Sequence, residues 1–447
     1  MAENSRVFLS PIVTTAAAAG YTCERLKSQQ QKASNVAAAP TAPLNVVCIA
    51  SHFKGEEFLR ECGRQGARVV LVTRQRTARE QWPREALDDV LTLPDDATAE
   101  LVTHVVCHLA RTRKLGCLIA LEEFDVITAA LTREHLGLPG MDASTARGFR
   151  DKLLMRRKAR DAGIKVPDFV HVNNYEEMGE FMENVPAPWI IKPRSDVSAS
   201  GIRKVDDAEQ VWRTIEALDA REAWQEKSTY YLLEQFVAGE VFHVDSVVEG
   251  GEVLFAGASC YGRPPLNVVH DGGVYTSFTV EYDTDEHTQL LELNRRLLKA
   301  LGHERGAAHA EFIKGEGDGE FYFLEIAARV GGAYTAETLE AASGINLWRE
   351  WARIELAHAR GDSHARPRPR REYGGIALSL ARQEHPDTSG YDDPEIVQRV
   401  EKPNHVGLIV RSAERGRVEE LLGQYGERFS RDFSAYVPPP ERRGINL

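Results

Sequence analysis

Two apolar segments flank a short turn of glycine and acidic residues in the run HAEFIKGEGDGEFYFLEI, residues 309–326. This pattern predicts a β-hairpin, because aromatic-rich strands joined by Gly and Asp favour a tight reversal of the chain. If the turn centres on Asp318, Glu311 and Glu325 lie opposite each other. Like charges in direct opposition destabilise a sheet unless a cation lies between them. The pair therefore indicates a Mg²⁺ site shared with substrate phosphates; a solvated face of an exposed hairpin is the alternative.

Residues 45–73 contain two apolar, β-branched runs, NVVCIA and ARVVLVT, on either side of a segment with helical spacing. The segment between them, SHFKGEEFLRECGRQG, ends at Gly66. This order predicts a β-α-β unit of a parallel sheet. Further apolar runs at DVLTLP and CLIALEE extend it to an open α/β domain. The loop after the first run has no GxGxxG, so a dinucleotide-binding fingerprint is absent.

The sequence changes character after residue 140. The segment STARGFRDKLLMRRKARDAG predicts one long amphipathic helix that stops at Gly163, and antiparallel-looking strands follow it. The chain is therefore α/β and α+β. We divide it into a flexible N-terminal arm (1–43), an α/β domain (44–139), an α+β domain (140–362), a Pro/Arg linker (363–372) and a small C-terminal α/β domain (373–447).

Composition excludes two classes of protein. The chain has 447 residues, with 55 Lys and Arg against 67 Asp and Glu, so its formal net charge is −12. An acidic chain is a poor candidate for coating nucleic acid, and no apolar run reaches the roughly 18 residues of a membrane span. None of the 6 cysteines stands in a CxxC pair, so we expect free thiols and a cytoplasmic protein.

A cationic residue close to the hairpin glutamates suits an anionic ligand. Arg329 follows Glu325 in EIAARVGGAY, beside Gly331 and Gly332. Its guanidinium matches anionic oxygens in a bidentate way, and glycines allow the backbone to approach a ligand closely. Arg329 is therefore a candidate for holding a transferring phosphoryl group or an oxyanion. A structural salt bridge to a hairpin glutamate is the alternative.

Two lysines extend this candidate site. Lys192 ends the apolar strand PWIIKP, and Lys152 stands early in the predicted long helix. The loop RSDVSASGI after Lys192 is rich in small residues, whose backbone N–H groups can fold over phosphates. Taken alone, each lysine is equally well explained without a ligand.

The segment LLEQFVAGEVFHVD reads as a strand, a short hinge and a second strand. Backbone groups of such a hinge can bind an adenine edge, while alternate side chains of the second strand face one pocket. His243 and Asp245 share one face of that strand. An ordinary core or surface histidine explains His243 at least as well as a ligand contact does.

In this order, the motifs GFRDKLLMRRKARDAGIKVPDF, PWIIKPRSDVSASGI, LLEQFVAGEVFHVD, HAEFI and LEIAARVGG resemble the ATP-grasp superfamily. The resemblance covers about residues 44–360 and is closest to carboxylate–amine ligases of the L-amino-acid ligase type. It implies a Rossmann-like N-terminal domain and a two-part grasp domain with ATP between two sheets. It also implies ADP-forming ligation that depends on Mg²⁺, with Mn²⁺ as a substitute.

The resemblance assigns roles residue by residue. Lys152 and Lys192 match the phosphate-contacting lysines, Glu311 and Glu325 match the magnesium carboxylates, and Arg329 matches the arginine near the transferred phosphoryl group. We take Arg329 and Lys192 as the catalytic pair. The other ATP-binding candidates are the flap residues Ser198, Ser200 and Gly201 and the adenine-hinge residues Glu234, Gln235, Phe236 and Val237.

Two positions depart from the family pattern. Many members have a metal-binding Asn two residues after the second glutamate, where this chain has Ala327. Many also have Glu two residues after the hinge glycine, where this chain has Val241. We therefore leave the number of metal ions open and expect His243 to contact the ribose, because it shares the strand face of Val241.

The resemblance implies small-molecule carboxylate and amine substrates and no nucleic-acid or membrane partner, and it is compatible with a homodimer. The acid attacks the γ-phosphate of ATP to form an acyl phosphate, from which the amine displaces phosphate. His270, Tyr334 and Glu123 are candidates for selecting the acid and the amine, and we expect the C-terminal domain to cover the cleft as a lid. An ATP-grasp kinase, a biotin-dependent carboxylase-like enzyme and a silent nucleotide-binding protein are the alternatives.

Overall fold

The computed structural model describes residues 43–196, 201–266, 268 and 272–436. The chain divides into two units, Met1–Pro43 and Leu44–Leu447, and the fold below is that of the second unit. The arm expected at residues 1–43 therefore falls almost wholly outside the described residues. No helix in the described part of the chain combines the length and the apolar composition that a membrane span needs.

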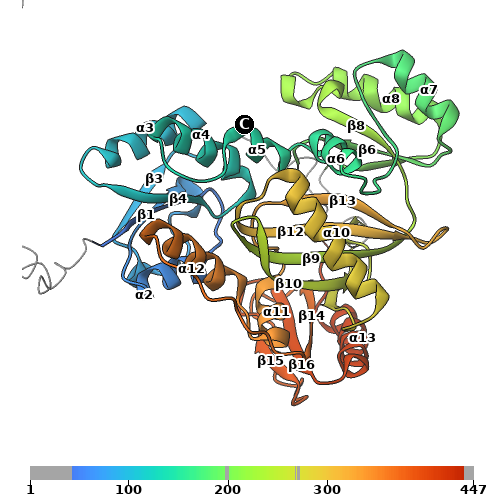
Figure 1. Cartoon of the computed structure of the whole chain (residues 1–447). Coiled ribbons are helices and arrows are strands. Elements are labelled where there is room, and N and C mark those ends of the chain that lie inside the picture. Colours follow the sequence, from blue (N-terminus) through green and yellow to red (C-terminus); the bar gives the residue numbers. More distant parts are fainter. Residues whose placement is uncertain (1–42, 197–200, 267, 269–271, 437–447) are drawn as a thin grey trace, which may run out of the picture. The chain divides into compact units, whose positions relative to one another are not determined.

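The N-terminal domain, whose strands β1, β3 and β4 are labelled in Figure 1, is an open parallel sheet with strand order β3-β2-β1-β4. Its apolar runs form strands because both strand faces are buried: Val47 and Ile49 join one core cluster, and Val46 and Cys48 join another. The predicted β-α-β unit and parallel sheet are confirmed. The elements are β1 (Asn45–Ala50), α2 (Glu56–Arg64), β2 (Arg68–Arg74), β3 (Asp89–Leu93), α3 (Ala99–Ala110), β4 (Leu115–Ala120) and α4 (Val126–Leu136).

The single long helix predicted after residue 140 is wrong, since the segment forms two helices, α5 (Ala143–Gly148) and α6 (Lys152–Asp161). Asp151 has an extended backbone, and its side chain accepts a hydrogen bond from the N–H of Leu153, so it caps α6 and interrupts the helical path. The interruption sets Lys152 at the first position of α6.

A small antiparallel sheet follows, with strand order β5-β8-β6-β7. Trp189 and Ile191 pack with the two helices of this part in one core cluster, so the alternate residues Ile190 and Lys192 face the other side. The elements are β5 (Phe169–His171), α7 (Tyr175–Asn184), β6 (Trp189–Pro193), β7 (Arg203–Val205), α8 (Ala208–Asp219) and β8 (Tyr231–Gln235).

An antiparallel sheet of eight strands completes the fold, in the order β13-β12-β9-β10-β11-β14-β16-β15. Phe242, Val244 and Phe312 pack against leucines of α10 on one face. The elements are β9 (Gly239–Glu249), β10 (Glu252–Tyr261), β11 (Tyr275–Thr279), α10 (Asp285–Leu301), β12 (Arg305–Gly315), β13 (Phe321–Ala327), α11 (Thr335–Ser343), α12 (Leu347–Arg360), β14 (Tyr373–Leu380), β15 (Ile396–Arg399), β16 (His405–Ser412) and α13 (Arg415–Asp432).

The C-terminal segment differs from the separate small domain that the sequence predicts at 373–447. Its strands continue the large sheet, because β14 pairs with β11 and β16 pairs with β14. Figure 1 shows β14 and β16 beside each other. Without β14, β11 would be an edge strand with unpaired backbone groups, so continuing the sheet satisfies both strands. The helix of this segment, α13, packs on this end of the sheet.

Candidate active site

A cavity of about 600 Å³ lies between the small sheet and the large sheet. Most of the predicted site residues in the described part of the chain line it. They are Glu123, Lys152, Lys192, Glu234, Gln235, Phe236, Val237, Glu311, Glu325 and Arg329. Ser198, Ser200 and His270 lie outside the described residues, and Gly201 precedes the lining residue Ile202.

The hairpin of β12 and β13 places Glu311 opposite Glu325, as the sequence predicts. The turn itself is centred slightly before Asp318, because Phe312 pairs with Phe323. The register shifts between Glu311 and Phe312, and this bulge restores the predicted pairing of the glutamates. Two carboxylates therefore stand side by side on the face that is turned to the cavity.

Each of these carboxylates has one oxygen held by the protein. Glu311 Oε1 accepts a hydrogen bond from the Tyr261 hydroxyl at 2.7 Å and lies 3.3 Å from His309 Nε2. Glu325 Oε2 lies 3.0 Å from Lys152 Nζ. The other oxygen of each carboxylate has no protein partner among the described residues. Two free carboxylate oxygens on one face fit a hard divalent cation such as Mg²⁺. The Ala327 side chain has no atom that could bind this ion.

The charges around Glu325 keep it ionised. Burial raises the pKa of Glu325, but the charges of Lys152 and Lys192 and a hydrogen bond from Lys152 outweigh burial and lower the pKa to about 2. Lys152 also donates a hydrogen bond to the main-chain oxygen of Asp196, at 2.6 Å. The ammonium group thus joins the hairpin to the segment that follows β6.

Lys192 is buried on β6 and lies 2.7 Å from Glu234 Oε2. Burial lowers its pKa, the charge of Arg156 lowers it further, and Glu234 opposes both effects, so the pKa lies at about 8. An added anion would stabilise the charged form of a buried lysine whose pKa is lowered in this way. The site is therefore suited to a phosphate group.

Glu234 is an internal anchor within the predicted adenine hinge. Its side chain is 3% exposed, and its carboxylate also lies 2.9 Å from Arg156 Nε, so it is directed at buried cations. The main-chain N–H groups of Gln235 and Phe236 are bonded to Asp168 and Pro188, respectively. For the N–H of Val237, no protein partner is found among the described residues. This N–H is the donor that the hinge leaves for a ligand.

Arg329 lines the cavity, but its ion-pair partner is Glu123 of the N-terminal domain and not a hairpin glutamate. The distance between Arg329 Nη2 and Glu123 Oε2 is 2.8 Å. Burial lowers the pKa of Arg329, but the charges of Glu123 and Glu122 outweigh it and raise the pKa above its ordinary value. The guanidinium stays charged at every physiological pH.

The ribose contact expected for His243 is not supported. His243 is 2% exposed and is absent from the cavity lining. Its Nδ1 lies 2.5 Å from Asp245 Oδ2, and its Nε2 lies 2.8 Å from the Ser277 hydroxyl. His243 and Asp245 do share one face of β9, but the side chains of Tyr261 and Ser277 from the next strands of the sheet lie against the imidazole. The lining histidine is His309, which the sequence analysis missed.

Asp245 joins the two histidines, since His309 Nδ1 lies 2.8 Å from its other oxygen. Ligand atoms of His243, Asp245 and His309 lie within 4.8 Å of one another, a spacing that can hold a metal ion. Burial lowers the pKa of His309, but the charge of Asp245 and hydrogen bonds outweigh it and raise the pKa to about 10. Each oxygen of Asp245 is hydrogen-bonded to a histidine, and its negative charge is balanced by the charged His309. The three residues therefore form a buried charge network that needs no metal ion.

Tyr334 was expected to contact substrate, but its side chain packs against a cluster of Ala341, Ile376 and Ile409 and does not line the cavity. The cavity is lined there by its neighbours Gly332, Ala333 and Thr335. Ala333 and Tyr334 have φ values of 52° and 61°. Two consecutive non-glycine residues in this region are strained, which is common where backbone approaches a ligand.

Two tyrosines from neighbouring strands also line the cavity, and sequence reasoning missed them. Tyr261 of β10 and Tyr275 of β11 lie with their ring centroids 5.7 Å apart. Strand alternation puts Tyr261 on one face of its own strand, but only the pairing of both β10 and β12 with β9 brings it to Glu311. No local signal in the sequence carries that pairing.

Comparisons with known proteins place two parts of the chain in ATP-grasp families. A family model described as an ATP-grasp domain matches residues 185–337, and a model described as an ATP-grasp N-terminal domain matches residues 59–140. The L-arginine-specific L-amino acid ligase of Bacillus subtilis is 25% identical over 272 residues, covering 60% of this chain and 64% of the relative. The D-alanine–D-alanine ligase of Verminephrobacter eiseniae is 26% identical over 234 residues, covering 49% of this chain and 67% of the relative. The match thus spans just under two thirds of the first relative.

Solved structures show the same fold. The L-amino acid ligase from Bacillus licheniformis has a TM-score of 0.67 and 18% identity, with 88% of this chain and 99% of that chain covered. The N5-carboxyaminoimidazole ribonucleotide synthetase from Thermus thermophilus has a TM-score of 0.65 and 17% identity, with 88% and 100% covered. The chain therefore belongs to the ATP-grasp superfamily, with relatives of the carboxylate–amine ligase type.

Proposed function

We propose that this chain is an ATP-dependent ligase that joins a carboxylate to an amine and releases ADP and phosphate. The observation that carries the proposal is the convergence of Lys152, Lys192 and Arg329 on one cavity with the opposed pair Glu311 and Glu325. Such a set can bind a polyphosphate and neutralise the charge that develops in phosphoryl transfer. The ligase relatives support the same reaction class.

In this proposal, the nucleotide binds with its adenine at the hinge and its phosphates at the two lysines. The hinge supports this orientation because Val237 keeps a main-chain donor for a base edge, while Ile190 and Leu324 offer apolar surface in the cavity. Lys192 supports it because a buried ammonium of lowered pKa is stabilised by an added phosphate.

A Mg²⁺ ion held by Glu311 and Glu325 would supply positive charge next to the phosphates. Lys152, which already contacts Glu325, is assigned to the phosphate oxygens on the same side of the cavity. Mn²⁺ is expected to substitute, because it accepts the same oxygen ligands.

The proposed reaction has two steps. A carboxylate oxygen of the acid attacks the γ-phosphorus of ATP, and the bond to ADP breaks, which gives an acyl phosphate. The amine then attacks the acyl carbon and loses a proton, and phosphate leaves with the oxygen that it received. We assign Lys192 to neutralising the charge of the phosphoryl group in the first step. We assign Arg329 to stabilising the anionic oxygens that form in the second step.

Amino acids are the substrate class that we propose for both the acid and the amine. The support comes from the relatives, which are named as ligases of L-amino acids and of D-alanine. The cavity adds Tyr261, Pro265 and Tyr275 beyond the phosphate-binding residues, so it offers an apolar wall to the side chain of a substrate.

The test is to measure release of ADP and phosphate from ATP and Mg²⁺ over a panel of amino acids, singly and in pairs. The proposal expects release that requires both an acid and an amine, with an amide as product. If ADP release does not depend on the amine and a phosphorylated acceptor accumulates, the protein is a kinase instead. Full-length protein with Lys192→Met is the control for contaminating ATPase activity.

A further inference from the structure

Glu123 has no free oxygen with which to select a substrate, contrary to the sequence expectation. It lies in the 3₁₀ turn Glu123–Asp125, which begins three residues after the end of β4, and its side chain is 8% exposed. Arg150 Nη1 lies 2.5 Å from Oε1, and Arg329 lies within hydrogen-bond distance of Oε2 through Nη2 at 2.8 Å and Nε at 3.2 Å. The carboxylate is thus shared between two arginines.

The bonds to Arg329 leave a defined part of its guanidinium available. Nε and Nη2 donate to Glu123, and Nη1 donates to the main-chain oxygen of Val330 at 3.0 Å. Because each terminal nitrogen carries two N–H groups, one N–H remains on each for an anionic ligand. Arg329 lines the cavity, and its side chain is 13% exposed.

Arg150 fixes the far side of the same carboxylate. Its side chain is 4% exposed, its Nη2 donates to the main-chain oxygen of Ser195 at 2.7 Å, and its guanidinium stacks on Phe124 at 5.1 Å. Glu123 is therefore held from both sides by buried contacts. A carboxylate held in this way has little freedom to turn toward a substrate.

We propose that Glu123 is a positioning residue, which orients the free N–H groups of Arg329 toward the anionic oxygens of the reaction and does not itself bind the acid or the amine. The inference rests on the proposed ligase function, because it concerns a residue that acts through Arg329. It gives the N-terminal domain a part in the chemistry of the grasp domain.

The experiment is a double-mutant cycle of Glu123→Gln and Arg329→Ala, with kcat and the KM of ATP, acid and amine measured for each protein. Glu123→Gln alone should lower kcat by about 100-fold, the order seen when one oxyanion donor is lost, with the KM values within about threefold of wild type. In the Arg329→Ala background, Glu123→Gln should lower kcat by less than about threefold, because the residue through which it acts is gone.

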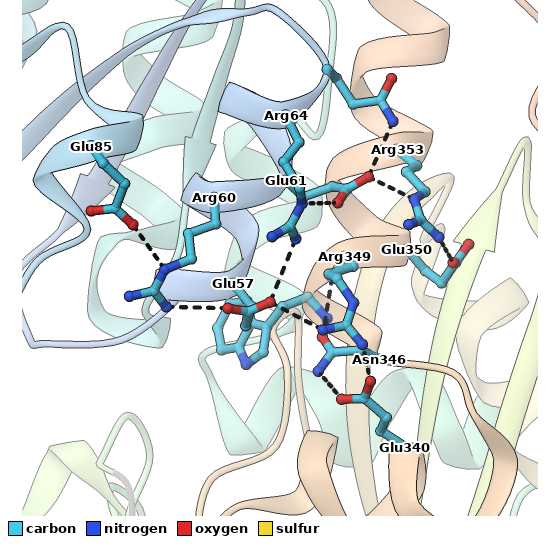
Figure 2. A network of polar contacts seen from close by, with 12 residues as sticks. Glu57, Arg60, Glu61, Arg64, Glu85, Glu340, Asn346, Arg349, Glu350 and Arg353 are labelled. Carbon is cyan, nitrogen blue, oxygen red and sulfur yellow. Dashed lines mark hydrogen bonds and ion pairs between the residues drawn. The ribbon is translucent and has the colours of Figure 1, made fainter.

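A matched control separates positioning from general damage. Glu61 of α2 is a buried glutamate shared by Arg64 and Arg353, with a side chain 3% exposed, and it does not line the cavity (Figure 2). Glu61→Gln is the same chemical change in a similar environment and should leave kcat unchanged. Thermal unfolding of each variant checks folding, and if Glu123→Gln does not fold, the cycle is run with Glu123→Asp.

Two results would overturn the inference. One is a folded Glu123 variant that keeps full kcat: with unchanged KM values Glu123 has no role in the reaction, and with a raised KM of the acid or the amine it is a substrate-binding residue. The other is an equal loss of kcat in both Arg329 backgrounds. Wild-type protein that shows no turnover dependent on acid and amine would instead contradict the proposed function, so the two failures are distinguishable.

Discussion

Glu234 and Lys192 form an ion pair across the neighbouring strands β8 and β6, with 2.7 Å between Glu234 Oε2 and Lys192 Nζ. Their side chains are 3% and 8% exposed, and Arg156 shares the same carboxylate. One buried anion thus compensates two cations. Because the positive charges exceed the negative one, removing Glu234 would destabilise the site. For the same reason, a bound phosphate would stabilise the charge of Lys192.

Replacing Glu234 with Gln should destabilise the protein strongly. The change leaves Arg156 and Lys192 buried without a counter-charge, and breaking a buried ion pair in this way typically costs about 3–5 kcal/mol. The free energy of unfolding in urea measures the effect. The control is Glu209→Gln, whose ion pair with Arg213 has both side chains more than 70% exposed, and which should cost less than about 0.5 kcal/mol. Equal effects of the two changes would contradict the account.

Nucleotide affinity should depend on pH through Lys192. The pKa of Lys192 is lowered by burial to about 8, below the roughly 10.5 of an exposed lysine, and bound phosphates favour its charged form. The Kd of ATP should therefore be constant below about pH 7.5 and rise by up to about tenfold per pH unit above pH 8, since binding then requires uptake of a proton.

Lys192→Arg is the control for this pH dependence, because an arginine stays charged over the whole range. Isothermal titration calorimetry at several pH values gives the Kd of both proteins. A wild-type Kd that stays constant up to about pH 9.5, or an equal rise in the arginine variant, would show that Lys192 is not the titrating group.

Glu325→Gln should abolish most of the turnover. The change removes one of two opposed carboxylates and the partner of Lys152, and loss of a metal-ligand charge should exceed the roughly 10–100-fold cost of losing a supporting contact. We expect kcat to fall by at least about 100-fold, with a higher Mg²⁺ requirement. Glu320→Gln, in the exposed turn of the same hairpin, should keep wild-type kinetics. Full turnover of the Glu325 variant would refute the metal role.

Tyr261→Phe should weaken metal binding without unfolding the protein. The hydroxyl donates to Glu311 Oε1 at 2.7 Å and so orients that carboxylate. Loss of such a supporting contact is expected to lower Mn²⁺ affinity, measured in the presence of ADP, by about tenfold. In the matched control, Tyr322→Phe, the lost hydroxyl bonds Asp318 in the exposed turn. An unchanged affinity in the Tyr261 variant would remove this role from the tyrosine.

Features that depend on neighbouring residues could be predicted from the sequence. The parallel strands of the N-terminal domain follow from continuous apolar runs. The opposition of Glu311 and Glu325 was predicted from one Gly-rich turn, although it also depends on the bulge after Glu311, which no sequence signal marks. The helix break at Asp151 was also local, since Asp favours the capping position. It was missed because the amphipathic pattern continues across it.

Features that depend on distant pairing could not be predicted. His243 and His309 share one face of the sheet, but only the order of the strands decides that His309 reaches the cavity and His243 is covered. Glu123 and Arg329 stand 206 residues apart in the chain, so no spacing rule joins them. The pairing of β14 with β11 was missed for the same reason.

If the acid becomes an acyl phosphate, one of its carboxylate oxygens must leave with the released phosphate. An acid substrate labelled in both carboxylate oxygens with a heavy oxygen isotope is incubated with enzyme, ATP, Mg²⁺ and the amine. Mass spectrometry then follows the label. Each released phosphate should carry one labelled oxygen, and the amide should keep the other. Unlabelled phosphate released together with the amide would contradict an acyl-phosphate intermediate.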